Sequence, residues 1–532
     1  MNSSKKLSES LKRLRNVGIA LSAEKDINKF FRIILDEAMY FTNADAATIY
    51  TVSEDRKALD FKVICTLSKN LRLGIADTSK WPSVPLYNED GSQRLANFVS
   101  YVAHTGEPLS IDDVYNQNLF DAAGTKKYDS NNNYHSKSMA AIPLKNHENE
   151  VLGVIQLINS IDAKGEVVSF SKQNILMLSS LASQAAISLS NKKLIESLEE
   201  LLYQFIQSIA AAIDRKSKNT GGHINRVASL AERLSQVIQK DQEYYPDVQF
   251  TTDELQEISL AAWMHDVGKI TTPVHVQDKG KKLETIFDRL EMVDLRFDLV
   301  EKVIENDILC QMQDGSEKNK EELKALLPKL ETYRQFVAKC NTGGEFMADE
   351  DLALLDEIRA FSYNSRGRDY YLINEDEYKN LQIRRGTLLW EEILKMREHA
   401  LVSFEMLSEL TFPKKFKNVP LFASAHHEKL NGKGYPNELT EDQLPLQARI
   451  IAVADVYEAL TAADRPYKPG KKLSETFKIL GFMAKDKDID PKLLNLFIDS
   501  GLYLEYARKY LKEEQIDEVD FERIKSIYNQ AM

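Results

Sequence analysis

The sequence predicts a multidomain protein in which an α+β domain is joined by a long helix to an all-α domain. The chain has 532 residues, more than one ordinary core accommodates, so roughly two to four folding units are expected. Runs rich in β-branched and aromatic residues gather in the first part of the chain. Residues 171–214 contain no glycine or proline, which indicates a continuous helix, and helical spacing of apolar residues prevails after it.

The first domain is expected to follow an N-terminal helix over residues 1–24 and to span residues 25–170. A helix is predicted at 27–41. Strands are predicted at 46–52, 59–64 and 151–158, because these runs have the residue content of strands.

The segment Ser138–Leu144, followed by Val151–Asn159, makes this domain resemble a GAF domain, a sensory module that often binds a small ligand over its sheet. The resemblance implies an antiparallel sheet with flanking helices. GAF domains that bind cyclic nucleotides carry an acidic pair after a phenylalanine, but here the first acidic residue after Phe170 is Glu196. The GAF ligand is therefore unknown, and a domain that only dimerises is an equal alternative.

The linker helix at 171–214 carries apolar residues in steps of seven, four, three and four, with Asn191 at the skipped position. This is the spacing of a short parallel coiled coil, in which a polar residue sets the register. The sequence therefore predicts a homodimer through this helix, with packing of the helix on its own domain as the alternative. The seam residues are Ile187, Leu194, Leu198, Leu201 and Phe205.

The all-α domain is expected over residues 215–515, with a C-terminal tail at 516–532. A charged, mostly helical insertion occupies about 280–386, and its candidate helices are 283–303, 318–338 and 348–361. The insertion is expected to form either a lid or substrate-selecting wall over the site, or a solvated helical hairpin with no catalytic role.

Six of the nine histidines lie after residue 222. Thr251 and Glu254 form a capping box for a helix on which His265 and Lys269 share an inward face. A buried imidazole and a buried cation need a partner. Imidazoles and carboxylates bind iron, manganese or zinc, so the sequence predicts a metal site and makes hydrolysis the leading function.

Four motifs occur in order: His265-Asp266, His426-His427 with Gly434-Tyr435-Pro436, the helix around Asp455, and Arg465-Pro466-Tyr467-Lys468. The pair His265-Asp266 resembles the HD superfamily of phosphohydrolases, and all four together resemble the HD-GYP family of cyclic dinucleotide phosphodiesterases. The resemblance spans about 205–510 apart from the insertion. It implies that the metal ligands are His223, His265, Asp266, His399, His426, His427 and Asp455, with Asp266 bridging two ions.

Two positions depart from the family pattern. His399 follows the Gly268-Lys269 segment only after the insertion, and His275 is the alternative candidate for the same metal ligand. The acid that holds a third metal in some members corresponds to Asn219, so two metals are predicted and a third is not. Iron or manganese suits the mixed ligands best, with zinc and nickel open.

By the same resemblance, Asp266 and Lys269 are the catalytic residues, and Lys269 contacts the scissile phosphate or protonates the leaving 3′ oxygen. Two metals about 3.5–4 Å apart activate water for in-line attack. The predicted substrate contacts are Arg465 and Lys468 to phosphate, and Gly434, Tyr435 and Pro436 along the substrate edge, with Tyr435 offering a stacking face for guanine.

The net charge of −12 argues against nucleic acid polymers and anionic membranes as partners. Three scattered cysteines and the lack of a long apolar run predict a cytoplasmic protein. The predicted function is hydrolysis of cyclic di-GMP to pGpG, GMP or both, under control of the GAF domain. The alternatives are hydrolysis of 3′,3′-cyclic GMP-AMP, a dinucleotide receptor with little activity, and an HD hydrolase acting on other nucleotides.

Overall fold

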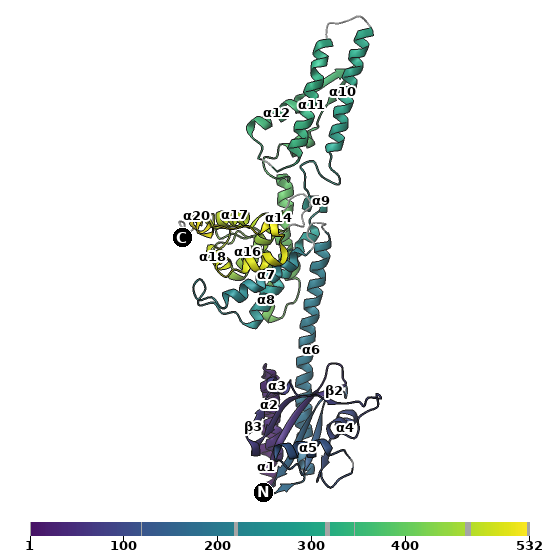
Figure 1. Cartoon of the computed structure of the whole chain (residues 1–532), viewed down its shortest axis with the longest axis vertical. Helices are drawn as coiled ribbons and strands as arrows, with labels where there is room; N and C mark the ends of the chain where they lie inside the picture. Colours follow the sequence, from purple (N-terminus) through teal and green to yellow (C-terminus); the bar gives the residue numbers. More distant parts are fainter. Residues whose placement is uncertain are drawn as a thin grey trace. The chain divides into compact units, whose positions relative to one another are not determined.

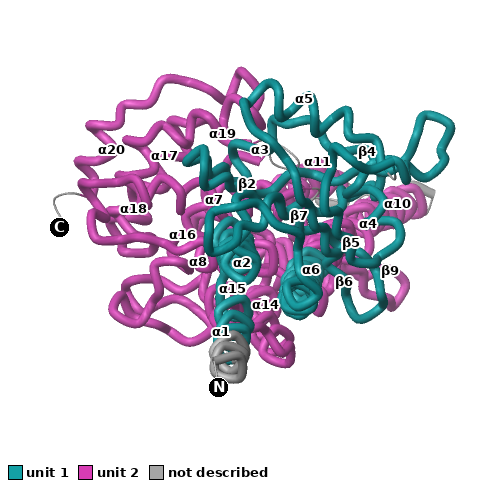
Figure 2. Tube along the Cα trace, turned by 90° about the horizontal axis from the view of Figure 1, so that it is seen from below, with its two compact units in different colours: residues 1–201 teal, residues 202–532 magenta. Residues whose placement is uncertain are grey.

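The chain folds as two units, residues 1–201 and 202–532, and helix α6 (Lys172–Lys216) contributes to both (Figure 2). The structure is a computed structural model. It describes residues 2–118, 120–216, 222–313, 320–344, 346–462 and 470–528.

The first unit is built on an eight-stranded antiparallel sheet with the order β3-β2-β1-β7-β6-β5, to which β4 and β8 add at β2 and β7. Ile155 of β7 pairs with Ile49 of β1 on one side and with Ile142 of β6 on the other. The strands are β1 (Ala44–Val52), β2 (Ala58–Thr66), β3 (Leu71–Leu73), β4 (Val84–Pro85), β5 (Leu109–Ile111), β6 (Met139–Lys145), β7 (Val151–Ile161) and β8 (Val167–Val168). The predicted α+β class and antiparallel sheet are confirmed.

Helices cover both faces of this sheet. One core contains residues of α1 (Asn2–Ala23), α2 (Ile27–Thr42) and the first half of α6, and a second contains residues of α4 (Phe98–Thr105). The unit also contains the short helices η1 (Leu67–Lys69), α3 (Ile75–Thr78) and α5 (Ala123–Asn132), of which α3 and α5 are labelled in Figure 1.

Helix α6 belongs to the first core well beyond residue 170, where sequence reasoning ended the domain. Leu178, Leu181, Ala185 and Leu189 are buried against the sheet, at steps of three or four that place them on one face of the helix. The segment predicted as a linker from residue 171 is therefore part of the domain core in its first turns.

The core of the second unit is helical. It is formed by the end of α6 with α7 (His223–Ile238), α8 (Thr252–Met264), α14 (Trp390–Ser408), α15 (Val419–Ser424), α16 (Leu446–Thr461), α17 (Leu473–Lys485), α18 (Pro491–Asp499), α19 (Leu502–Tyr510) and α20 (Phe521–Tyr528). The short elements η2 (Val267–Thr271), α9 (Val274–Gln277), η3 (Lys414–Phe416), η4 (Ala425–His427) and η5 (Glu513–Gln515) connect them. The Thr251–Glu254 capping box begins α8, as predicted.

The predicted C-terminal tail at 516–532 contains the packed helix α20. Its Ile524 and Tyr528 are buried in the core, and the Tyr528 hydroxyl donates to Asn495 Oδ1 at 2.6 Å. The prediction of a tail was wrong for residues 521–528. They form a short helix whose apolar side chains pack against α17 and α18.

The insertion forms a subdomain with a hydrophobic core of its own (Figure 1). Its elements are α10 (Leu290–Gln313), α11 (Lys320–Asn341), α12 (Asp349–Ala360), β9 (Ser362–Ser365), β10 (Arg368–Tyr371) and α13 (Glu375–Leu381). The hairpin of β9 and β10 was not predicted. Because Phe297, Val300, Tyr333 and Leu355 are buried together, the insertion is more than a solvated helical hairpin.

A buried ion pair fastens the insertion to the first turn of α14. Lys279 Nζ donates to Glu392 Oε2 at 2.8 Å and to Asn380 Oδ1 at 2.9 Å, and the Lys279 side chain is only 1% exposed. The helix that carries His399 is therefore anchored at its start by the base of the insertion.

Of the helices that the structure describes, none is both long enough and apolar enough to cross a membrane.

We expect Glu392→Ala to lower the free energy of unfolding of the second unit by about 3–5 kcal/mol, because it leaves the buried Lys279 ammonium without its carboxylate. Urea unfolding measures the change. The matched control is Glu391→Ala, which breaks an exposed ion pair with Lys379 and is expected to change stability little. Equal effects of the two substitutions would contradict this account of the anchor.

Candidate metal centre

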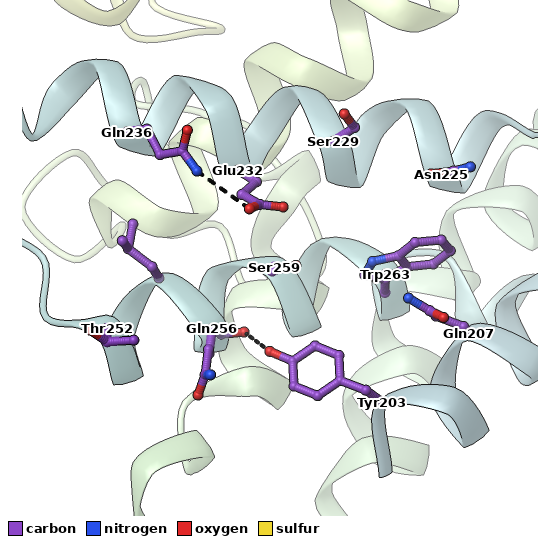
Figure 3. A pocket seen from close by; sticks show the side chains of 11 residues that line it. Tyr203, Gln207, Asn225, Ser229, Glu232, Gln236, Thr252, Gln256, Ser259 and Trp263 are labelled. Carbon is purple, nitrogen blue, oxygen red and sulfur yellow. Dashed lines mark hydrogen bonds between the residues drawn. The ribbon is translucent and has the colours of Figure 1, made fainter. Parts of the chain in front are cut away.

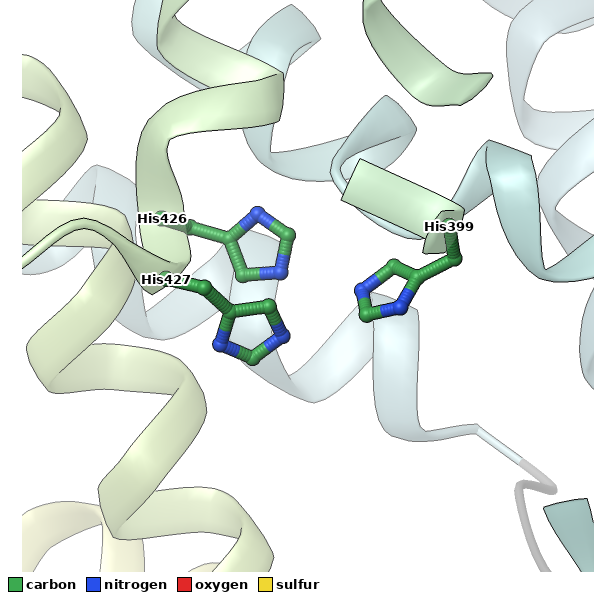
Figure 4. A group of neighbouring side chains, drawn as sticks. All are labelled: His399, His426 and His427. Carbon is green, nitrogen blue, oxygen red and sulfur yellow. The ribbon is translucent and has the colours of Figure 1, made fainter. Parts of the chain in front are cut away.

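The seven predicted ligands lie on separate elements that converge inside the second unit. His223 begins α7, His265 and Asp266 join α8 to η2, His399 lies in α14, His426 and His427 lie in η4, and Asp455 lies in α16. Figure 4 shows the His399 ring facing the pair His426 and His427.

Ligand atoms of these side chains form three groups in which all atoms lie within 4.8 Å of one another. The groups are His399, His426 and His427; His223, His265 and Asp455; and His265, Asp266 and His426. His275, the rival of His399, is exposed and belongs to none of them. The structure thus brings His399 to the cluster despite the insertion.

The inward-facing atoms of the cluster lack hydrogen-bond partners among the described residues. Four buried atoms have no such partner: His265 Nε2, His399 Nε2, His426 Nε2 and Asp266 Oδ1. The other ring nitrogen, Nδ1, of each of these histidines lies at 2.7, 2.5 and 2.6 Å from the carbonyl oxygens of Ala262, Met396 and Ala423. An Nδ1–H that donates to a carbonyl leaves the Nε2 lone pair pointing inward, as metal-ligating histidines require. Buried polar atoms without partners are costly, so these residues fit a bound cation.

Asp266 lies between two sets of imidazoles. Its Oδ2 is 3.5 Å from His223 Nε2 and 3.2 Å from His265 Nε2. Its Oδ1 is 3.5 Å from His399 Nε2 and 4.0 Å from His426 Nε2. Each carboxylate oxygen of Asp266 therefore faces a different set of imidazoles.

The protonation states of Asp266, His426 and His427 suit metal binding. Burial raises the pKa of Asp266, but the charges of His265 and Lys269 outweigh it and hold that pKa well below its usual value. Burial, together with neighbouring imidazoles, lowers the pKa of His426 well below the usual value and that of His427 to about 3. An ionised carboxylate and neutral imidazoles are the forms that coordinate metals.

Glu458 and Arg226 support His223, and sequence reasoning missed both. His223 Nδ1 lies 2.5 Å from Glu458 Oε2, and Arg226 Nε donates to Glu458 Oε1 at 2.7 Å. Burial lowers the pKa of His223, but Asp266, Asp455 and Glu458 raise it well above the usual value. The signal in the sequence was spacing, because Glu458 and Arg226 each lie three residues after a predicted ligand on the same helix face.

Gly268 and Ser403 hold the His265-Asp266 segment against α14. The Gly268 backbone N–H donates to Ser403 Oγ at 2.9 Å, and Ser403 Oγ donates to the His265 carbonyl at 3.1 Å. A Cβ at Gly268 would lie 2.0 Å from the His399 carbonyl oxygen. Only glycine permits this approach, which brings Asp266 next to His399.

The residues predicted at the substrate edge lie in different surroundings. Gly434 is buried, and a Cβ there would lie 2.4 Å from Glu428 Cα, so it packs against the turn instead of lining an open edge. The Tyr435 ring stacks on the His427 ring with centroids 4.7 Å apart, and Pro436 beside it is half-buried. Arg465, Lys468 and Asn219 lie outside the described residues.

Lys269 lies at the cluster, with its Nζ 2.5 Å from Asp266 Oδ2. The end of α6 reaches the same segment. Lys216 Nζ donates to the carbonyl oxygens of Lys269, Ile270 and Thr272 at 2.8, 2.6 and 2.6 Å. The position of the η2 segment is therefore tied to the last turn of α6.

A separate groove of about 580 Å³ lies among α6, α7 and α8 (Figure 3). Tyr203, Gln207, Glu232 and Trp263 are among its lining residues, and the Tyr203 hydroxyl donates to the Gln256 carbonyl at 3.0 Å. None of the seven predicted ligands is among its lining residues.

Comparison with protein families assigns both domains. Residues 26–189 match the model of the GAF domain, and residues 376–493 match the model of the HD domain. The chain therefore contains a GAF domain followed by an HD domain, as the sequence predicted. His223, His265 and Asp266 precede the matched HD segment, because the insertion separates them from the other ligands.

Three relatives illustrate the similarity. "Cyclic di-GMP phosphodiesterase response regulator RpfG" of Xanthomonas campestris is 28% identical over 208 residues, which are 38% of this chain and 53% of that protein. A "Probable cyclic di-GMP phosphodiesterase" of Vibrio cholerae is 34% identical over 146 residues, 25% of this chain and 32% of that protein. The "3'3'-cGAMP-specific phosphodiesterase 3" of Vibrio cholerae is 36% identical over 131 residues, 23% of this chain and 27% of that protein. The chain thus spans about half the length of these relatives or less.

We expect Glu458→Gln to weaken metal retention by about 10–100-fold, because the His223 ring loses the carboxylate that orients it. Metal content after competition with a chelator measures the effect. Glu505→Gln, which alters an exposed ion pair with Arg233, is the control and should retain metal like the unchanged protein. Equal retention by the Glu458 variant would contradict the supporting role of this carboxylate.

Proposed function

We propose that this protein is a metal-dependent phosphodiesterase that hydrolyses cyclic di-GMP to pGpG, GMP or both. The observation that carries the proposal is the placement of Asp266, whose two oxygens face two sets of imidazoles with partnerless Nε2 atoms. The names of the relatives above support a cyclic dinucleotide as the substrate.

Two divalent cations, iron or manganese, suit the mixed histidine and carboxylate donors. His223, His265, Asp266 and Asp455 would hold one, and Asp266, His399, His426 and His427 the other. When bound, two such ions supply an activated water and neutralise charge on the reacting phosphodiester. A third metal is not part of the proposal.

The remaining roles fall to residues around the cluster. Lys269, with its ammonium beside Asp266, would contact the scissile phosphate or give a proton to the leaving 3′ oxygen. Tyr435, stacked on His427, would offer an aromatic face to guanine. Arg465 and Lys468 are proposed phosphate contacts on the strength of the sequence alone.

The second candidate substrate is 3′,3′-cyclic GMP-AMP, which the name of one relative specifies. A receptor without activity is less well supported, because a binding module has no use for a buried set of partnerless metal donors.

We also propose that the GAF domain regulates the HD domain through α6 and that α6 pairs with its copy in a homodimer. The predicted seam residues remain exposed in the single chain, with exposed fractions of 54–61%: Ile187, Leu194, Leu198, Leu201 and Phe205. The hydrogen bonds of Lys216 to the η2 carbonyls would carry a movement of α6 to the segment that bears Asp266 and Lys269.

We expect protein reconstituted anaerobically with iron or manganese to hydrolyse cyclic di-GMP, 3′,3′-cyclic GMP-AMP or both. Asp266→Ala should lower kcat by about 10²–10³-fold or more, because the carboxylate that faces both sets of imidazoles, and would help to hold both cations, is lost. Chromatography of the products measures turnover. His275→Ala, at an exposed histidine outside the cluster, should keep full activity. No turnover of either dinucleotide by the unchanged protein would refute the proposed function.

We expect the unchanged protein to be a dimer and Leu198→Glu to be a monomer, because a charge at the centre of the seam cannot be buried between two helices. Light scattering gives the mass. Lys193→Glu, at an exposed position of the same helix off the seam, is the control and should remain dimeric. A monomeric unchanged protein would remove the proposed dimer.

A further inference from the structure

Three side chains form a ladder beside the candidate metal centre: Trp390 and Arg397 of α14, and Tyr435. Arg397 Cζ lies over the Trp390 ring at 5.6 Å from its centroid and over the Tyr435 ring at 5.1 Å. The Tyr435 ring in turn stacks on His427 at 4.7 Å. The ladder therefore leads from the outer part of α14 to a candidate metal ligand.

The ladder follows from the geometry of α14. Trp390 and Arg397 are seven residues apart, so they share a face of the helix, and His399 follows Arg397 by two residues. Both ladder residues of α14 are exposed, Trp390 at 60%. Glu392, two residues after Trp390, pairs with Lys279 and anchors the start of α14.

Arg397 differs from the other arginine at the centre. Arg226 is engaged by the Glu458 carboxylate, whereas in the described part of the chain no hydrogen bond or ion pair engages the Arg397 guanidinium. Contacts with two aromatic rings position the group while its N–H donors stay available. A guanidinium presents five donors in a planar fork, and its contacts with two rings reduce the conformational entropy that it loses on binding.

We infer that Trp390, Arg397 and Tyr435 form a subsite for one purine base of the substrate, in which Arg397 selects guanine. Bases stack on aromatic side chains, and Trp390 is the most open ring of the ladder. The fork of an arginine matches O6 and N7 of guanine, whereas adenine presents an amino donor in place of O6. The inference rests on the proposed function and adds the residue that reads the base.

The test compares cyclic di-GMP with cyclic di-AMP for the unchanged protein and for Arg397→Gln. Arg397→Gln should raise KM for cyclic di-GMP by roughly 10–100-fold with a much smaller change in kcat, and should lose the preference over cyclic di-AMP, because one bidentate contact to guanine is removed. Bis(p-nitrophenyl) phosphate has no purine, so its hydrolysis should fall far less than that of cyclic di-GMP.

One further variant tests whether Arg397 recognises the base or only supplies a positive charge, and a second serves as a control. Arg397→Lys keeps the charge without the fork, so it should lose guanine preference like Arg397→Gln. Full recovery by lysine would overturn the assignment and indicate a phosphate contact. Arg359→Gln removes an exposed arginine of the insertion that lies over the Tyr378 ring at 4.5 Å, and this variant should behave as the unchanged protein.

Calorimetric binding of cyclic di-GMP distinguishes failure of this inference from failure of the proposed function. If the unchanged protein binds the dinucleotide without hydrolysing it, weaker binding by Arg397→Gln and Trp390→Ala still supports the subsite. Equal binding or equal KM in the unchanged protein and Arg397→Gln overturns the subsite while leaving the hydrolysis intact. Absence of binding by the unchanged protein overturns both.

Discussion

The second unit depends on one buried carboxylate, Asp266, and on the imidazoles that surround it. Burying a charge costs several kcal/mol unless partners compensate it, so the fold must deliver those partners from distant parts of the chain. His223 and His265 face one oxygen of Asp266, and His399 and His426 face the other. The helices of the HD domain are arranged around this requirement.

Supporting contacts explain how the arrangement holds together. Carbonyl oxygens one turn earlier accept the Nδ1–H of three of the histidines, while Glu458 takes that role for His223. Across the insertion, the close approach of Gly268 to α14 brings the His265-Asp266 segment to His399. The insertion leaves this geometry intact because it folds around a core of its own and is anchored by Lys279 where α14 begins.

Helix α6 belongs to both units and has a different role in each. Its first turns complete the core under the GAF sheet, and Ile206, Ala210 and Ile213 near its end are buried in the HD core. Its middle exposes an apolar stripe at coiled-coil spacing. Lys216 in its last turn holds the carbonyl oxygens next to Lys269. Through these contacts, a movement of α6 would reach the segment that carries Asp266 and Lys269, as the proposed regulation requires.

The sequence by itself determined the domain order, the antiparallel GAF sheet, the capping box of α8 and the residue types of the candidate centre. These features are local, since strand content, helical periodicity and short motifs lie within single segments. Tertiary structure decided which distant groups meet. It placed His399 and not His275 in the cluster. It brought Glu458 to His223 and Ser403 to Gly268, and it packed Gly434 against its turn and α20 against the core. Such contacts join residues far apart in the chain, and periodicity along one helix carries no information about the surface on which that helix will pack.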